Sequence, residues 1–414
     1  MPLSFEAVPA PRFRAGFEFL FLAGIAVLPF IALANIVLAL AFILFLCARL
    51  RVRLDAQGAW LLLYALFSCV SVFFAAQPER GVPHLDKVLL FLIFPMAVAC
   101  YQQFRERRVF IWIFILQSIG FSVFGLVEYI VKSIHDPLYR IHGPVSHYMT
   151  YSGILMILAG ILLAYASRGP DARLRRVCLG AALLSFIPIL LSLTRNAWLG
   201  LLAMLLVLAL ARRKWAYLVA AAALILLMAF LPGAVGKRFR SISDPADPTN
   251  RDRLAMWKAG VLMVLEKPVT GQGMGMAEED YVRFRQPAAV RSWVPHLHSN
   301  AFQIAAERGI PALVAYFGFV GATLAAGWRR RESWRGLATL LSASGIFIAG
   351  FFEFNFGLTV MFWHTLAAAA LHHTPASTRY SESGRGRLPL PPREVNSRGT
   401  THSPFGNPLD ESKP

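Results

Sequence analysis

The chain has 414 residues, of which 57% are hydrophobic and only 15% are charged, and its mean hydropathy is +0.54. This composition excludes a soluble globular protein and predicts a polytopic membrane protein. The formal net charge of +18 would suit a nucleic-acid partner, but the positive residues stand in short clusters beside apolar segments and in the C-terminal tail. We therefore expect membrane lipids, and no nucleic acid, as partners.

Apolar segments of the length of a membrane span recur about twelve times, since a hydrocarbon core of about 30 Å takes roughly 20 residues of helix. In chain order they cover residues 16 to 30, 31 to 48, 58 to 76, 86 to 102, 109 to 131, 149 to 167, 177 to 193, 197 to 211, 215 to 232, 309 to 328, 336 to 352 and 356 to 372. The predicted fold class is therefore all-α, a polytopic membrane protein with about 12 transmembrane helices.

Basic clusters follow every second one of these segments, near residues 49 to 53, 105 to 108, 168 to 176, 212 to 214 and 329 to 335. By the positive-inside rule, both termini are expected in the cytoplasm and the polar segment 233 to 297 in the periplasm. Residues 1 to 373 would then form a transmembrane domain with one large periplasmic loop. Residues 374 to 414 are rich in Ser, Pro, Gly and Arg, which predicts a disordered cytoplasmic tail.

Arg195 lies between two apolar runs with almost no loop, in the sequence LLSLTRNAWLG that starts at Leu190. A charge at membrane depth is costly, and such residues usually face the bundle interior or a wet cavity. The alternative is that Arg195 snorkels to lipid headgroups. We favour a functional role, because snorkelling does not require the flanking Thr194 and Asn196.

The periplasmic loop is predicted to contain an amphipathic helix. Its apolar side chains recur at helical spacing at Leu254, Trp257, Val261 and Leu265. Asn250 is expected to cap its start and Pro268 to end it, and its apolar face is expected to lie on the membrane or over the helix bundle. Arg253 precedes Trp257 by one turn on the same side, so its guanidinium can point into a cavity roofed by that helix.

A short helix is predicted from about Ala301 to Arg308. Asn300 and Gln303 resemble the capping box at the start of a helix. Gly309, followed closely by a proline, resembles a helix stop. The polar loop is therefore expected to end in this short helix before the next membrane span begins.

His296 and His298 lie just before that helix, whose positive dipole end would keep the His298 ring neutral and able to accept a proton. A metal site is one alternative, because His-x-His in an extended segment can put both rings on one side, and a purely structural pair is another. No cluster of carboxylates or cysteines at ligand spacing accompanies the pair in the sequence, so we expect no metal. Catalysis or substrate binding is the favoured role.

Four motifs follow one another along the second half of the chain. They are TRNAWLG at 194 to 200, RLAMW at 253 to 257, EKPVTGQGMG at 266 to 275, and HLHSN at 296 to 300 followed by ERGIP at 307 to 311. The set, in this order, resembles the O-antigen ligase and polymerase superfamily over roughly residues 190 to 315. The glycine-rich part of the third motif lacks the strand and lysine of a nucleotide cradle, so no cofactor is expected.

The resemblance implies a metal-independent glycosyltransferase of the bacterial inner membrane, which takes a glycan from an undecaprenyl diphosphate carrier on the periplasmic face. It further implies that Arg195 and Arg253 bind the diphosphate and that His298 lies near the acceptor hydroxyl. This chemistry is sound, because arginines can stabilise a departing diphosphate without a metal and a neutral histidine can accept the hydroxyl proton. Further substrate-binding residues are expected at Arg251, Trp257, Gly271, Gly273, His296, Asn300 and Gln303.

The acceptor distinguishes the members of this superfamily. An O-antigen ligase delivers to the lipid A-core oligosaccharide in lipopolysaccharide biosynthesis, an O-antigen polymerase to another lipid-linked glycan, and an O-linking oligosaccharyltransferase to protein. One large loop and a short tail favour the ligase by family analogy. A transporter of an anionic lipid or solute would also need buried arginine, but it would be expected to show broken helices and paired repeats, and the sequence shows neither.

Overall fold

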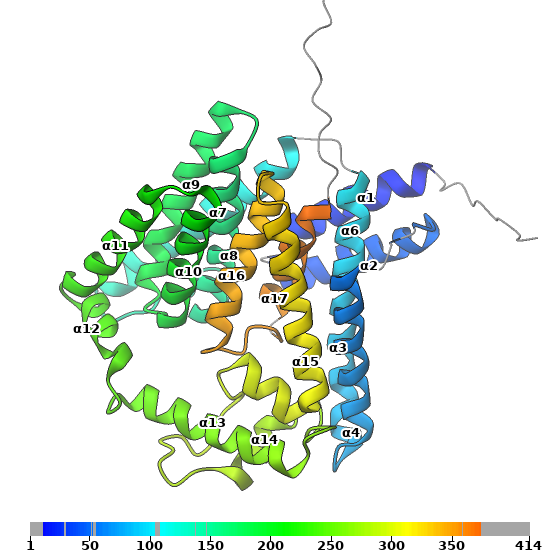
Figure 1. Cartoon of the computed structure of the whole chain (residues 1–414), viewed down its shortest axis with the longest axis vertical. Helices are drawn as coiled ribbons and strands as arrows, with labels where there is room; N and C mark the ends of the chain where they lie inside the picture. The colour runs from blue at the N-terminus through cyan, green and yellow to red at the C-terminus, as the bar shows by residue number, and fades with distance from the viewer. Residues whose placement is uncertain are drawn as a thin grey trace, which may run out of the picture. The chain divides into compact units, whose positions relative to one another are not determined.

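The computed structural model describes residues 11 to 373, except residues 29, 51, 53 to 54, 104 to 107, 137, 146 and 358. All regular elements in these residues are helices (Figure 1), which confirms the predicted all-α class. The predicted tail, residues 374 to 414, lies outside the described residues.

The α-helices are α1 (Pro11–Ala26), α2 (Ile31–Cys47), α3 (Ala56–Phe73), α4 (Pro78–Gly81), α5 (Asp86–Leu89), α6 (Ile93–Gln103), α7 (Arg108–Ser133), α8 (Tyr148–Arg168), α9 (Ala172–Leu191), α10 (Arg195–Arg212), α11 (Trp215–Phe230), α12 (Ala234–Arg240), α13 (Pro248–Glu266), α14 (Ala277–Phe284), α15 (Asn300–Arg329), α16 (Trp334–Gly350) and α17 (Thr359–Ala370). Four short 3-10 helices accompany them, η1 (Val82–Leu85), η2 (Leu90–Leu92), η3 (Ser241–Ser243) and η4 (Leu371–His373).

Seven of the described helices or continuous helical segments are long and apolar enough to cross a membrane, or eight if the bent pair formed by α11 with the segment Ala234–Ser243 counts as one span. That pair bends by 105°. The remaining predicted spans correspond to α1, α2, α16 and α17, which have 16, 17, 17 and 12 residues and so fall short of the usual length. The structure therefore supports a membrane protein with seven or eight candidate spans, and the predicted count of about 12 stays a prediction.

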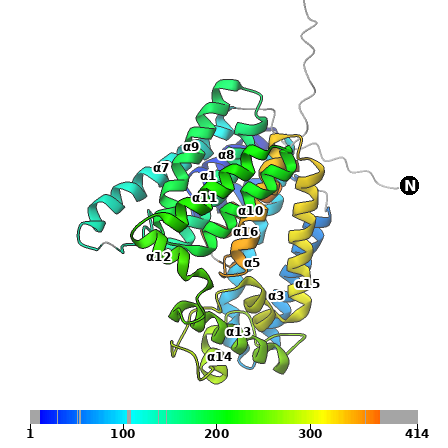
Figure 2. The same cartoon turned by 60° about the vertical axis from the view of Figure 1, so that its left-hand side comes forward.

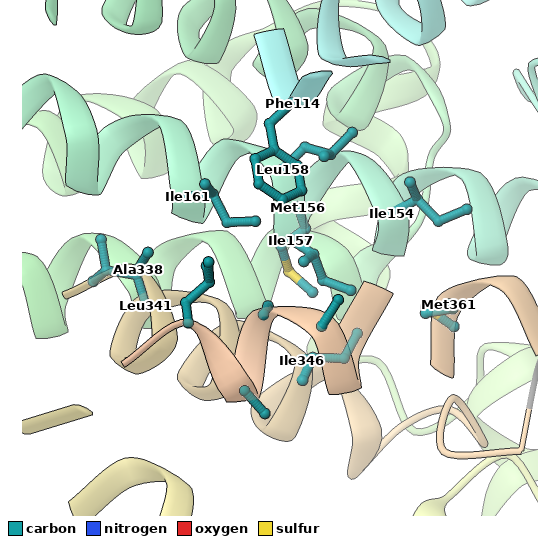
Figure 3. Close-up of a cluster of buried hydrophobic side chains, with 14 of the residues drawn as sticks. Phe114, Ile154, Met156, Ile157, Leu158, Ile161, Ala338, Leu341, Ile346 and Met361 are labelled. Atoms are coloured by element: carbon teal, nitrogen blue, oxygen red, sulfur yellow. The ribbon is translucent and has the colours of Figure 1, made fainter. Parts of the chain in front are cut away.

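Helix α8 lies at the centre of the apolar core. Figure 3 shows Leu158 of α8 beneath Phe114 of α7, with Leu341 and Ile346 of α16 on the other side. All four side chains are buried. Between helices in an apolar environment, side-chain packing and hydrogen bonds replace the drive to leave water. One such bond runs from Ser342 Oγ to the Ile157 carbonyl at 3.1 Å.

Polar contacts join helix ends at one end of this core. Arg108 lies 3.2 Å from Asp171, Arg168 pairs with Glu332, and His373 lies 3.4 Å from Asp55. The first contact joins the starts of α7 and α9, the second joins the ends of α8 and α15, and the third joins η4 to the start of α3. Helices α13 and α14 lie at one end of the described bundle, where α10 and α15 begin (Figures 1 and 2). The alternation of basic and polar ends matches the sequence pattern, whereas the side of the membrane on which each end lies stays a prediction.

Helix α13 is the predicted amphipathic helix, but the expected cap was wrong. Asp247 caps it by accepting hydrogen bonds from the backbone nitrogens of Thr249 and Asn250 at 2.9 and 3.2 Å. The reason is that Pro248 takes the first helical position, where its missing N–H costs nothing. The Asn250 amide instead donates to carbonyls of the preceding turn. The helix ends before Pro268, as predicted.

The two faces of α13 have different surroundings. Met256 and Met263 are buried against the neighbouring helices. Leu254, Val261 and Leu265 from the predicted stripe are 50%, 44% and 71% exposed. An apolar stripe turned outward from the bundle suits a helix that lies on a membrane surface.

Helix α15 is broken at Gly309, as the predicted stop requires. Gly309 has φ 78° and ψ 172°, a conformation that glycine tolerates and that no helix residue adopts. The Ile310 N–H donates to the Pro268 carbonyl and not to the preceding turn of helix. The short helix before the break therefore begins at Asn300 and ends near Arg308, close to the predicted bounds.

The expected capping box of this short helix was wrong. The N-cap residue is Ser299, and its side chain makes no capping hydrogen bond. The Asn300 side chain is used elsewhere: Oδ1 accepts from the backbone nitrogens of Asn355 and Phe356, and Nδ2 donates to Asn355 Oδ1 and to the Tyr316 hydroxyl. Long-range contacts therefore replaced the local cap.

Candidate functional site

A cavity of about 320 Å³ lies between α10 and α13. Its lining residues are Arg195, Asn196, Leu199, Ile242, Ser243, Asp244, Pro245, Asn250, Arg253, Leu254, Trp257 and Phe352. The structure thus brings together Arg195, Arg253 and Trp257, three of the residues predicted for the site. Arg253 and Trp257 face the same cavity from successive turns of α13, as their spacing predicted.

Arg195 is 5% exposed and is the first residue of α10. Its Nη1 donates to the Ser241 carbonyl at 2.8 Å and to Ser241 Oγ at 3.1 Å, while Nη2 lies 3.3 Å from Asp247 Oδ1. The same aspartate lies 3.8 Å from Arg238. A single carboxylate is therefore shared by two arginines, which leaves positive charge available to an anionic ligand.

Arg253 is 9% exposed, and its Nε has no hydrogen-bond partner among the described residues. Two other polar atoms of the same cavity, Trp257 Nε1 and Asn196 Oδ1, are also buried without a partner among those residues. The Trp257 ring is held by stacking on Phe302, with centroids 5.4 Å apart. Buried polar groups normally find partners, so these atoms are groups for which a bound polar ligand can supply the missing hydrogen bonds.

A second cavity, of about 160 Å³, lies on the other side of Arg253. Its lining residues are Arg140, His147, Tyr148, Met149, Arg238, Thr249, Asp252, Arg253, Met256, Arg291, Pro295, His296 and His298. Arg253 lines both cavities, so the two share this buried arginine. The two predicted histidines face the smaller cavity only.

His298 is held by a glutamate that the sequence analysis missed. His298 Nδ1 lies 3.0 Å from Glu353 Oε2, and His296 Nε2 lies 3.4 Å from the other oxygen, Glu353 Oε1. Glu353 is 2% exposed and precedes α17 in the loop after α16. An ionised carboxylate can only accept a hydrogen bond. We therefore place the proton of a neutral His298 ring on Nδ1, which leaves a free lone pair on Nε2.

Burial and the neighbouring charged groups both shift the pKa values of this cluster. Burial alone would raise the pKa of the Glu353 carboxyl, but the charge and hydrogen bond of His298, with the charges of His296 and Arg253, lower it to about 2. Burial lowers the pKa of His296 to about 4, although Glu353 opposes that shift. At neutral pH the site therefore holds a carboxylate beside a neutral His296 ring.

The backbone of His298 is also unusual. Its φ of 49° is left-handed, which is rare for a residue with a side chain. Such a conformation costs of the order of 1 to 3 kcal/mol and persists only when the surroundings hold it. Here the Leu297 N–H donates to Gln303 Oε1 at 2.7 Å and the His298 N–H to His296 Nδ1 at 3.3 Å.

The expectation that no carboxylate accompanies the histidines was wrong, because the chain folds Glu353 onto them from a distant loop. The ligand atoms of His296, His298 and Glu353 lie within 4.8 Å of one another, a spacing that a metal ion also accepts. The sequence did contain a signal. Glu353 is an acidic residue set between two apolar spans, in FFEFNF, and such residues usually have a functional partner.

Asn300 and Gln303, two of the other predicted site residues, hold backbone segments next to the site. Both are buried, and neither lines either cavity. Gln303 holds the backbone before His298, and Asn300 holds the loop that follows Glu353. Their geometry favours a positioning role over direct substrate contact.

The predicted glycines and Arg251 also lie outside the cavity walls. Gly271 has φ 69°, and a Cβ there would come within 2.3 Å of the Glu307 carbonyl carbon. Gly273 has φ 122° and packs against Ala75. The glycines therefore allow the third motif to lie against the short helix of α15. Arg251 is exposed on α13.

Buried arginines beside a carboxylate-supported histidine, within a helical chain with several candidate membrane spans, are typical of a membrane protein with a site for an anionic ligand. Residues 180–317 match the family model described as O-antigen ligase. This match covers the part of the chain that contains the four motifs, and it confirms the predicted resemblance to the O-antigen ligase superfamily, whose members are glycosyltransferase-like enzymes. No curated protein matches the chain.

Proposed function

We propose that this protein is an O-antigen ligase that transfers a glycan from undecaprenyl diphosphate to the lipid A-core oligosaccharide on the periplasmic face of the inner membrane. One observation supports the proposal: the buried Arg253, whose Nε has no hydrogen-bond partner among the described residues, lines both a cavity that contains Arg195 and a cavity that contains His298. A donor diphosphate and an acceptor hydroxyl can therefore meet at one guanidinium.

The larger cavity suits the donor. Arg195 and Arg253 offer guanidinium groups to the diphosphate, and Leu199, Leu254 and Phe352 offer an apolar wall to the adjoining lipid. When the bond between the anomeric carbon and the diphosphate oxygen breaks, the electron pair leaves with the diphosphate. Preorganised arginines in a water-poor site stabilise that developing charge, and such stabilisation is usually the largest contribution to catalysis.

The smaller cavity suits the acceptor. As the acceptor oxygen forms its bond to the anomeric carbon, the hydroxyl proton passes to Nε2 of His298. Glu353, hydrogen-bonded to Nδ1 of the same ring, keeps the ring oriented and stabilises the imidazolium that forms. His296 completes the contact on the second carboxylate oxygen.

The proposed reaction needs no metal. Each oxygen of Glu353 already faces one imidazole, through a hydrogen bond to His298 and a contact of 3.4 Å with His296, so the short spacing of the cluster does not require a metal. The adjacent charge of Arg253 also disfavours a second cation. Transfer by the purified protein should be unchanged by EDTA, and EDTA-sensitive transfer restored by a divalent ion would overturn this part of the scheme.

Deletion of the protein tests the choice of acceptor. For a ligase, the lipopolysaccharide should consist of core without O chains, while long glycan remains on the lipid carrier. A core that bears a single repeat would indicate a polymerase. An unchanged lipopolysaccharide would overturn both readings and direct the search to a protein acceptor or to transport.

A further inference from the structure

The smaller cavity has more positive charge than a neutral sugar requires. Its wall contains Arg140, Arg238, Arg253 and Arg291 but only one carboxylate, Asp252. Asp247 and Glu353 offset Arg238 and Arg253 from outside the wall, so the uncompensated charge is that of Arg140. Burial lowers the pKa of Arg140 to about 10, which still leaves this guanidinium charged at neutral pH. An excess of arginine in a partly buried cavity is costly unless an anion compensates it.

The single carboxylate is already committed. Asp252 Oδ1 accepts from the backbone nitrogens of Val290 and Arg291, both at 3.1 Å, and Oδ2 lies 3.3 Å from Arg291 Nε. These contacts hold the backbone and Nε of Arg291, whose side chain is 56% exposed. The two terminal nitrogens of Arg291 make no hydrogen bond to the described residues, so both can bind one anion in the forked geometry that arginine favours.

Arg140 is positioned in a similar way on the opposite side. Its Nε and Nη2 each donate at 3.1 Å to the carbonyls of Ser192 and Leu193, and its guanidinium lies 3.3 Å from the ring centroid of Tyr148. The guanidinium also hydrogen-bonds the Tyr148 side chain, and no carboxylate pairs with it among the described residues. Arg140 and Arg291 therefore line the same small space from different elements of the fold.

His298 shows which substrate this space would hold. It lines the smaller cavity and not the larger one, so the hydroxyl that loses its proton to His298 lies there. Arg195 lines only the larger cavity, which leaves the donor diphosphate with its own arginine. A volume of about 160 Å³ is below the range of whole-ligand pockets and suits one group of a larger molecule.

We propose that the smaller cavity binds the acceptor through an anionic group, a phosphate or a carboxylate, carried by the sugar that receives the glycan or by its neighbour. This inference rests on the proposed function. Arg291 and Arg140 hold that anion, and Arg253 remains shared with the donor. The protein thereby selects a charged acceptor sugar over a neutral one.

The test uses the full-length purified protein, lipid-linked glycan and lipid A-core. The core is supplied in three forms: untreated, stripped of phosphate with hydrofluoric acid, and with its carboxylates amidated. Arg291→Gln should raise KM for untreated core about tenfold, the effect of one charge-assisted hydrogen bond, with KM for the donor unchanged. Wild-type protein should show a similar rise in KM for one of the two modified cores. With that core, Arg291→Gln should show little further rise in KM.

Arg283→Gln is the matched control. Arg283 is also 56% exposed on the same external segment and also pairs with one carboxylate, that of Glu266, but it lines neither cavity. Its kinetics should equal those of the wild type. Arg140→Lys, which keeps the charge and loses the fork, should reproduce the acceptor defect of Arg291→Gln in a protein of normal yield.

Three results would overturn the inference. A raised KM for the donor, with the acceptor unaffected, would mean that the diphosphate fills this cavity. Unchanged kinetics of Arg291→Gln, or equal use of all three cores by the wild type, would mean that no anion is recognised there. A wild-type protein inactive on every core would instead overturn the proposed function itself, and the inference with it.

Discussion

Replacing Glu353 with glutamine tests the link between the carboxylate and the chemistry. The substitution keeps size and shape, but it removes the negative charge that faces His298 at 3.0 Å and His296 at 3.4 Å. A hydrogen bond to a charged group contributes about 1.5 to 3 kcal/mol. If that interaction is made fully in the transition state, Glu353→Gln should slow transfer by about 10- to 150-fold.

The kinetic pattern distinguishes positioning from a general loss of structure. The fall should appear in kcat, with KM for the lipid-linked donor nearly unchanged, because the donor arginines do not contact Glu353 within hydrogen-bond distance.

The assay follows transfer of lipid-linked glycan to lipid A-core by purified protein of matched yield and melting temperature. Glu279→Gln provides the control, because Glu279 is an exposed carboxylate of α14 that pairs with Arg80 and lines neither cavity. A folded Glu353→Gln protein with the wild-type kcat would refute the assigned role.

Four further predictions follow from the site and the topology. Arg195→Lys should lose most of its activity although the charge is kept, because an ammonium cannot grip two phosphate oxygens; full activity in cells at normal protein level would indicate lipid snorkelling. His298→Ala should fold normally and transfer about 10² to 10⁴ times more slowly, the usual contribution of a positioned base, with His296→Ala milder; a wild-type turnover by His298→Ala would exclude the histidine from the chemistry. A cysteine at Ser243 in a cysteine-free protein should react with an impermeant thiol reagent in intact cells, and a shielded cysteine would contradict the proposed topology. The free energy of unfolding should fall as pH drops from about 6.5 to about 4, because over this window the unfolded chain binds a proton at His296 that the folded protein excludes. His296→Gln should remove up to about 3 kcal/mol of this pH dependence in denaturant unfolding, and an unchanged pH dependence would refute the buried neutral ring.

The helices were predictable from hydrophobic segments and from punctuating residues, whereas their local caps were not. Pro268 ended α13, and Gly309 broke α15, where the sequence placed those signals. Asn250 and Asn300 were chosen as caps because asparagine commonly caps helices. In the structure both amides hold other backbone segments, and those tertiary partners are not visible from local sequence.

The site was predictable where function requires a residue that is costly to bury. Arg195 and Arg253 stood out by position, and the structure brings them to one cavity. Glu353 was not found, because it pairs with His298 across the fold and no local spacing joins them. The second cavity was likewise invisible, since Arg140 and Arg291 belong to separate loops that meet only after folding.

The break at Gly309 has a mechanical consequence. The carbonyls of Ala306 and Glu307 accept from Gln272 and Gly273, and the Ile310 N–H is turned to Pro268, so the ladder of helical hydrogen bonds does not run through this point. The short helix that follows the histidines is therefore hydrogen-bonded to the segment after α13 and not to the span that follows. When bilayer thickness changes, a span responds by tilting. Such a tilt can be absorbed at this joint, and the reacting groups keep their register in membranes of different thickness.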